Sequence, residues 1–136
     1  MFSLRTHNVL DYFIGAFLVV SPWIFGFDGV TAARSVFLVG GIALIGYSLL
    51  TNYYYSVARI IPLGVHMAFD AILGVVFILA PALFGYREFL TQGQYAAHVV
   101  LGIGAVGLVA LTRPRTEAAK TPAERAAIAH DVPLPH

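Results

Sequence analysis

Two histidines and two aspartates stand out, because titratable side chains are rare in this sequence and these four recur at one spacing. His7 precedes Asp11 by four residues, and His66 precedes Asp70 by the same step. Residues i and i+4 lie on one face of a helix, so each histidine can reach its aspartate. Imidazole nitrogens and carboxylate oxygens can hydrogen bond to each other, bind a divalent first-row metal ion or pass a proton.

The segments that carry these pairs are copies of one another. "HNVLDYFIGAFLVVSPWIFGF", which begins at His7, aligns with "HMAFDAILGVVFILAPALFGY", which begins at His66, at a constant offset of 59. The next apolar segments also match, since "GIALIGYSLLT" aligns with "GIGAVGLVALT" at an offset of 61. The sequence therefore predicts two tandem helical hairpins, residues 7–53 and 66–112, related by a pseudo-two-fold axis along the membrane normal.

Composition indicates that lipid is the solvent for most of the chain. Of 136 residues, 59% are hydrophobic and only 11% are charged, whereas soluble domains average about 25% charged. The mean hydropathy is +0.81. The absence of cysteine excludes disulfides and thiolate metal sites. A net charge of +1 gives no reason to expect nucleic acid as a partner.

Four apolar segments are long enough to cross a bilayer, since a spanning helix needs about 20 residues. They cover residues 6–27, 35–53, 65–86 and 95–112. Short connections make successive helices antiparallel neighbours. The expected fold is therefore an all-α membrane protein, with a four-helix bundle in residues 1–112. We expect the first segment to be retained rather than cleaved as a signal peptide, because Asp11 interrupts its apolar run.

Basic residues predict the orientation of the bundle. With an even number of spans, both termini share one side. That side carries Arg5, Arg59, Arg113, Arg115, Lys120 and Arg125. The other side carries only Arg34 and Arg87. Because cytoplasmic loops are rich in Lys and Arg, both termini are expected in the cytoplasm. The protein is expected in the cell (inner) membrane. The proline-rich tail, residues 113–136, is expected to be mobile, with a short helix from Thr121 to about Ala129.

Ser21, Pro22 and Trp23 stand near the outer end of the first span. Proline lacks an N–H group and clashes with the preceding turn, so the helix should bend or end there. The Ser21 hydroxyl could bond to the carbonyl that the proline frees. Trp23 should anchor at the lipid headgroups, the alternative being that it lines a ligand pocket. Pro81 repeats only the proline, so the bend is expected in both hairpins and the anchor in one.

The Ser21-Pro22-Trp23 motif, toward the end of the first helix of a two-helix unit, resembles the SPW-repeat family of integral membrane proteins. The resemblance covers residues 7–112 and excludes the tail. The second copy departs from the motif and reads Ala80-Pro81-Ala82. The resemblance implies two transmembrane helices in each repeat, and it implies no particular activity.

Two interpretations of the histidines and aspartates remain open. Gly15 follows Asp11 by four residues and Gly74 follows Asp70 by four, so each glycine continues the helix face of its histidine and aspartate. The simplest packing turns these two faces toward each other and brings the four titratable side chains together. If they only pair, the protein is a structural or accessory subunit or scaffold, which packs against itself as a homo-oligomer or within a larger membrane complex. The alternative is a metal-, haem- or proton-handling protein, with a divalent metal or haem as the cofactor. No Ser-His-Asp arrangement is persuasive, so an enzyme is not expected.

Overall fold

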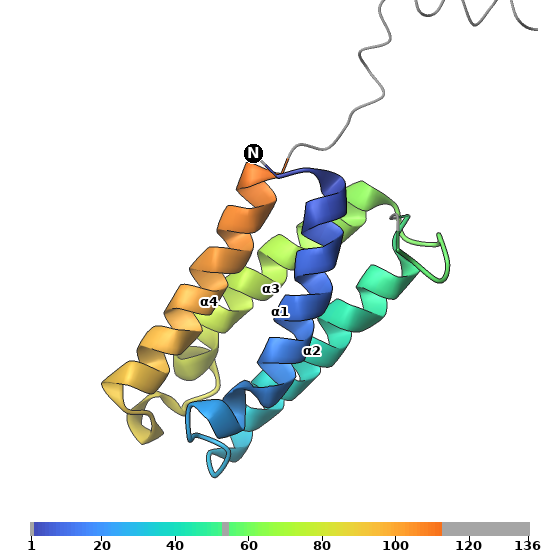
Figure 1. Cartoon of the computed structure of the whole chain (residues 1–136). Coiled ribbons are helices and arrows are strands. Elements are labelled where there is room, and N and C mark those ends of the chain that lie inside the picture. The colour runs from blue at the N-terminus through green and yellow to red at the C-terminus, as the bar shows by residue number, and fades with distance from the viewer. Residues whose placement is uncertain (1, 53–54, 113–136) are drawn as a thin grey trace, which may run out of the picture.

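The computed structural model describes residues 2–52 and 55–112, so the predicted tail and its short helix lie outside the described residues. The described chain forms four long helices, with one turn of 3₁₀ helix, Arg87–Phe89 (η1), before the last. They are α1 (Leu4–Ile24), α2 (Thr31–Leu50), α3 (Leu63–Leu83) and α4 (Gln92–Leu111). The helices run side by side, and the start of α1 and the end of α4 lie at the same end (Figure 1). The predicted all-α fold class is confirmed.

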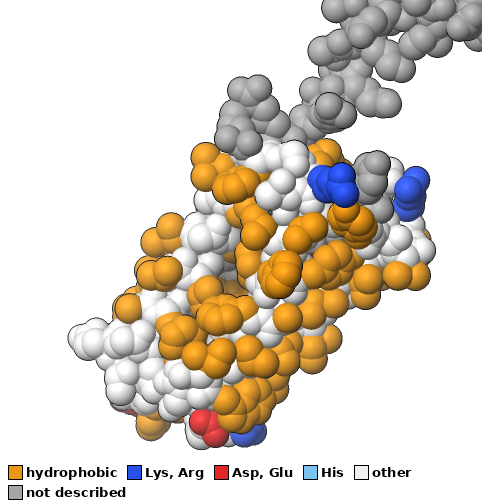
Figure 2. Space-filling view, viewed as in Figure 1, with side chains coloured by type: hydrophobic (Ala, Val, Ile, Leu, Met, Phe, Trp, Pro, Cys, Tyr) orange, Lys and Arg blue, Asp and Glu red, His pale blue; other side chains and the backbone are white. Residues whose placement is uncertain are grey.

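Three of the helices, α2, α3 and α4, are long and apolar enough to cross a membrane. The helix α1 is less clearly a span, because it carries Arg5, His7 and Asp11 although it is 21 residues long. It nevertheless lies within the same bundle (Figure 1). Figure 2 shows hydrophobic side chains over the middle of one face and charged side chains toward its two ends. This distribution suits a bundle that faces hydrocarbon along its length.

All four helices begin earlier than the apolar segments predict. The largest shift is in α2, which covers Thr31–Leu50 where residues 35–53 were expected. Polar caps explain two of the early starts. Ser3 Oγ accepts a hydrogen bond from the Thr6 backbone N–H at the start of α1, and Thr91 and Gln94 form a capping box at the start of α4. Such caps satisfy backbone donors that hydropathy does not register.

Both odd-numbered helices end two residues after their proline, through the same C-terminal cap. The cap is a Schellman motif, in which a glycine adopts a left-handed conformation and the next residue bonds back to the helix. Gly26 has φ 70° and Gly85 has φ 66°. The N–H group of Phe27 donates to Pro22 O at 2.9 Å, and that of Tyr86 donates to Pro81 O at 3.0 Å. The prolines therefore mark corresponding helix ends in the two copies.

The Ser21 hydroxyl bonds to a different carbonyl from the one that the sequence suggested. Pro22 frees the carbonyl of Leu18, four residues earlier. Ser21 Oγ–H instead donates to Phe17 O at 2.6 Å. This is the carbonyl four residues before the serine itself, which lies within easiest reach of a serine side chain on a helix.

Glycines set the contacts within each hairpin. A Cβ atom added at Gly41 of α2 would lie 2.6 Å from Gly15 O of α1, and one added at Gly102 of α4 would lie 2.5 Å from Gly74 O of α3. The prediction that Gly15 and Gly74 face each other between the hairpins is therefore wrong. Eight residues advance a helix by about 80° beyond two full turns, so each glycine points toward its own hairpin partner.

Large side chains make the contacts between the hairpins. The Phe37 ring of α2 lies edge-on to the Phe77 ring of α3, with 4.8 Å between centroids. A Cβ atom added at Gly40 would lie 2.9 Å from the Phe77 ring. Leu18 and Leu44 add further buried apolar surface. Backbones thus approach closely inside a hairpin, whereas side chains join one hairpin to the other.

Candidate functional site

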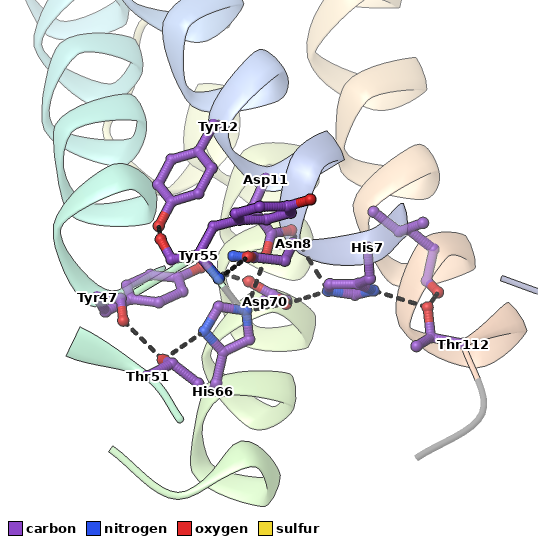
Figure 3. Close-up of polar contacts among 11 residues, drawn as sticks. His7, Asn8, Asp11, Tyr12, Tyr47, Thr51, Tyr55, His66, Asp70 and Thr112 are labelled. Atoms are coloured by element: carbon purple, nitrogen blue, oxygen red, sulfur yellow. Dashed lines mark hydrogen bonds and ion pairs between the residues drawn. The ribbon is translucent and has the colours of Figure 1, made fainter. Parts of the chain in front are cut away.

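The structure brings the four predicted side chains together at the end of the bundle where α1 and α3 begin (Figure 3). We call His7, Asp11, His66 and Asp70 the His–Asp cluster. None of the four residues is more than 5% exposed. One ligand atom from each lies within 4.8 Å of the others. The site is therefore compact and shielded from solvent.

Each histidine contacts the aspartate of both hairpins. His7 Nε2 lies 3.0 Å from Asp70 Oδ2 and 3.3 Å from Asp11 Oδ1. His66 Nε2 lies 3.1 Å from Asp11 Oδ2 and 3.1 Å from Asp70 Oδ2. The contact between helices is thus at least as close as the i,i+4 contact within one helix. The His–Asp cluster is a cross-link between the two hairpins.

Two threonines hold the opposite sides of the imidazole rings. His66 Nδ1 lies 2.8 Å from Thr51 Oγ1, whose hydroxyl donates to Tyr47 O at 2.6 Å. His7 Nδ1 lies 2.6 Å from Thr112 Oγ1, whose hydroxyl donates to Leu108 O at 2.7 Å. A hydroxyl has one proton, and here a carbonyl accepts it. Each histidine must therefore donate its Nδ1–H group to the threonine, which turns Nε2 toward the carboxylates.

Sequence reasoning missed these threonines, although a signal was present. Thr51 and Thr112 are the last letters of the matched stretches "GIALIGYSLLT" and "GIGAVGLVALT". Both copies therefore place a hydroxyl at the end of the even-numbered helix, beside the start of an odd-numbered one. Tyr47 had no such signal, since Leu108 stands at the equivalent position. Its hydroxyl donates to Asp70 Oδ1 at 2.5 Å.

Further polar contacts fix the loop after α2 against α1 (Figure 3). The Tyr55 backbone N–H donates to Asn8 Oδ1 at 3.1 Å, and Tyr12 Oη–H donates to Tyr55 O at 2.9 Å. Arg5 Nη2 donates to Tyr55 Oη at 2.6 Å. The second repeat has Met67 and Ala71 at the positions of the asparagine and tyrosine, so it lacks the side chains that make these two bonds.

The donor set of the cluster fits a small cation and not a haem. Two imidazole nitrogens and two carboxylate oxygens are ligands that Zn²⁺ and related divalent ions accept. A haem would have to lie between His7 Nε2 and His66 Nε2, where carboxylate oxygens already lie 3.0–3.3 Å from both atoms. Asp11 and Asp70 also line a small, otherwise apolar cavity of about 30 Å³ on the interior side of the cluster, which has room for a water molecule.

The Ser-Pro-Trp motif lies away from the cluster, at the opposite end of α1. Ser21, Pro22 and Pro81 are buried. Trp23 is 56% exposed, so its ring lies on the outer surface. That position suits the predicted headgroup anchor, which stays a prediction.

Comparison with known proteins gives one match. No curated protein and no solved structure matches the chain. The SPW repeat domain matches residues 5–119, which include both hairpins and reach seven residues beyond the range of the sequence resemblance. Together with three helices of membrane-spanning length, this match shows that the chain is a membrane protein that belongs to the SPW repeat family.

Proposed function

We propose that the protein is a non-catalytic structural subunit of the membrane, in which the His–Asp cluster fastens two helical hairpins into one unit. The observation that carries the proposal is the crossed contact, in which His7 reaches Asp70 at 3.0 Å and His66 reaches Asp11 at 3.1 Å. A satisfied buried polar network rigidifies a structure and selects one arrangement of its parts.

The packing of the rest of the bundle explains why such a fastening would be useful. Close backbone contact occurs within the hairpins, at Gly15 with Gly41 and at Gly74 with Gly102. In lipid, apolar side chains gain little by leaving the solvent, so apolar contacts alone bind helices weakly. A polar cross-link therefore supplies specificity that the Phe37–Phe77 contact does not.

Two substitutions of one aspartate test the cross-link. Asp11→Ala removes the carboxylate and leaves both imidazoles without one of their partners, whereas Asp11→Asn keeps a hydrogen-bond acceptor. In the presence of a chelator, which leaves only the His–Asp contacts, we expect the alanine variant to lower the thermal unfolding temperature in detergent more than the asparagine variant. Glu88→Ala, at an exposed position in η1, is the control. An alanine variant as stable as the wild type would show that the cluster fastens nothing.

We also propose that both termini face the cytoplasm. Among the described residues, Arg5 and Arg59 lie toward the cluster end, while Arg34 and Arg87 lie at the other end with Asp28 and Glu88. The bias of the full sequence favours a cytoplasmic cluster end. Because the chain has no cysteine, single cysteines report unambiguously. An impermeant thiol reagent on intact cells should label Gly29→Cys and not Ala119→Cys, and the reverse pattern would overturn the orientation.

A further inference from the structure

We infer that the His–Asp cluster binds one divalent first-row transition metal ion, best represented by Zn²⁺. The ligands are His7 Nε2, His66 Nε2 and one carboxylate oxygen each from Asp11 and Asp70. The inference rests on the proposed cross-link and deepens it, because it names the ligand that closes the link between the hairpins.

The two threonines determine which imidazole nitrogens carry protons. The hydroxyls of Thr51 and Thr112 donate to backbone carbonyls, so their oxygens can only accept from the imidazoles. Each imidazole therefore carries a proton on Nδ1. A neutral imidazole then presents a lone pair on Nε2 to carboxylate oxygens 3.0–3.3 Å away. Lone pairs that face one another at this distance repel, so a positive charge must lie among these atoms.

The geometry favours a metal ion over protons as that charge. Protons on both Nε2 atoms would serve one crossed contact each, His7 with Asp70 Oδ2 and His66 with Asp11 Oδ2. The contacts within each helix, at 3.3 Å and 3.1 Å, would then have no hydrogen bond of their own, because a hydrogen bond weakens steeply as it bends toward a second acceptor. A central ion attracts all four ligand atoms at once. A tetrahedral site with bonds of about 2.0–2.2 Å has ligand–ligand edges of about 3.3–3.6 Å. The His–Asp contacts of 3.0–3.3 Å would lengthen slightly, and the widest pair of ligand atoms, up to 4.8 Å apart, would move closer by about 1 Å.

The surroundings match those of a metal site. A histidine that binds a metal almost always donates its other ring N–H to a neighbouring oxygen, and Thr51 and Thr112 accept that bond on both rings. Tyr47 orients the Asp70 carboxylate in the same way. A divalent ion also neutralises the two carboxylates, which lowers the cost of burying them in a membrane bundle. Calcium is disfavoured, because it takes six to eight oxygen ligands.

The test measures metal content and affinity on the full chain. The protein is purified in mild detergent with an affinity tag that contains no histidine, and bound metals are determined by mass spectrometry. We expect about one Zn²⁺ per chain, as for a closed four-ligand site. Co²⁺ added to chelator-treated protein should give the strong visible absorption of tetrahedral cobalt. Thr51→Val should weaken Zn²⁺ binding by about 10–100-fold, because it removes only an outer partner of a ligand.

Two variants separate this site from other histidines of the chain. Asp11→Asn should abolish stoichiometric Zn²⁺ binding, because a neutral amide is a poor ligand. His98→Phe, which removes a buried histidine at the opposite end of the bundle, should leave it unchanged. Zn²⁺ that remains bound to Asp11→Asn at wild-type affinity would place the metal elsewhere and overturn the inference.

The outcome for the metal is distinguishable from the outcome for the cross-link. A wild-type protein that binds no Zn²⁺ or Co²⁺, and whose unfolding temperature a chelator does not change, would overturn the metal inference. If Asp11→Ala still lowers the unfolding temperature in that case, the hairpins are fastened by the His–Asp contacts themselves.

Discussion

The two ends of the bundle solve the same packing problem with different residues. At the cluster end, both repeats contribute a histidine and an aspartate at equivalent positions. At the other end four rings meet, and we call them the aromatic end. They are Phe27, Phe37, Tyr86 and His98, with neighbouring centroids 4.7–5.6 Å apart. Here the first repeat supplies two phenylalanines, whereas the second supplies a tyrosine and a histidine at the equivalent positions.

The difference shows which interactions require identical copies. In the His–Asp cluster every group satisfies the charge or hydrogen bond of another, so a change in one repeat would leave partners in the other unsatisfied. Aromatic packing needs area and shape, which Phe, Tyr and His can all supply. Among the described residues, Tyr86 Oη and His98 Nε2 are buried without a hydrogen-bond partner.

The largest effect is expected from His66→Phe at the cluster end. The substitution leaves Asp11 and Asp70 buried without one of their two imidazole partners, and loss of one member of a buried ionic group typically costs about 3–5 kcal/mol. Chemical or thermal unfolding in detergent measures the loss. The same substitution at the aromatic end is the matched control, so a small effect of His66→Phe would remove the distinction between the two ends.

Thr51→Val should have the next largest effect. Valine keeps the shape of threonine and removes the oxygen that accepts from His66 Nδ1. A buried donor left without a partner costs about 1–3 kcal/mol. Thr51→Ser keeps the hydroxyl and should retain most of the stability in the same unfolding measurement. If serine and valine destabilise equally, Thr51 acts by packing and does not fix the tautomer of His66.

Much of the fold could be predicted because the repeat made the pattern visible. The shared offset identified two hairpins, and the i,i+4 spacing of His7 and Asp11 put both on one helix face. Apolar length located the four helices to within a few residues of their observed bounds. These features depend on periodicity along one chain segment, which a sequence displays directly.

The remaining features depend on neighbours in space. The partner of Gly15 is Gly41 on the next helix, and the angular drift of an eight-residue step decides this. The crossed contact of His7 with Asp70 depends on how the hairpins meet. Tyr47 occurs in one repeat only, so no internal comparison could identify it.

Gly85→Ala tests a feature of the aromatic end that both repeats do share. A left-handed backbone at φ 66° costs a residue with a Cβ atom about 1–2 kcal/mol, although no atom lies within 4 Å of the added Cβ. Gly26→Ala should cost the same in the equivalent cap. Gly93→Ala is the control, because that glycine is helical and equally uncrowded. Equal stability of Gly85→Ala and Gly93→Ala in the unfolding measurement would mean that the Schellman cap does not limit the helix end.

The smallest effect is expected from His98→Phe, the counterpart of His66→Phe. His98 Nδ1–H donates to Gln94 O at 2.8 Å, and this bond would be lost. A net hydrogen bond contributes about 0.5–1.5 kcal/mol. The substitution also removes the buried Nε2 atom, which has no hydrogen-bond partner. Removing such an atom stabilises the folded protein by a similar free energy. Phe37 occupies the equivalent position in the first repeat, which shows that a phenylalanine ring suits this site. The unfolding free energy should therefore stay within about 1 kcal/mol of the wild type. A loss as large as that of His66→Phe would show that His98 Nε2 serves a partner of its own, and the aromatic end would then be a second polar site.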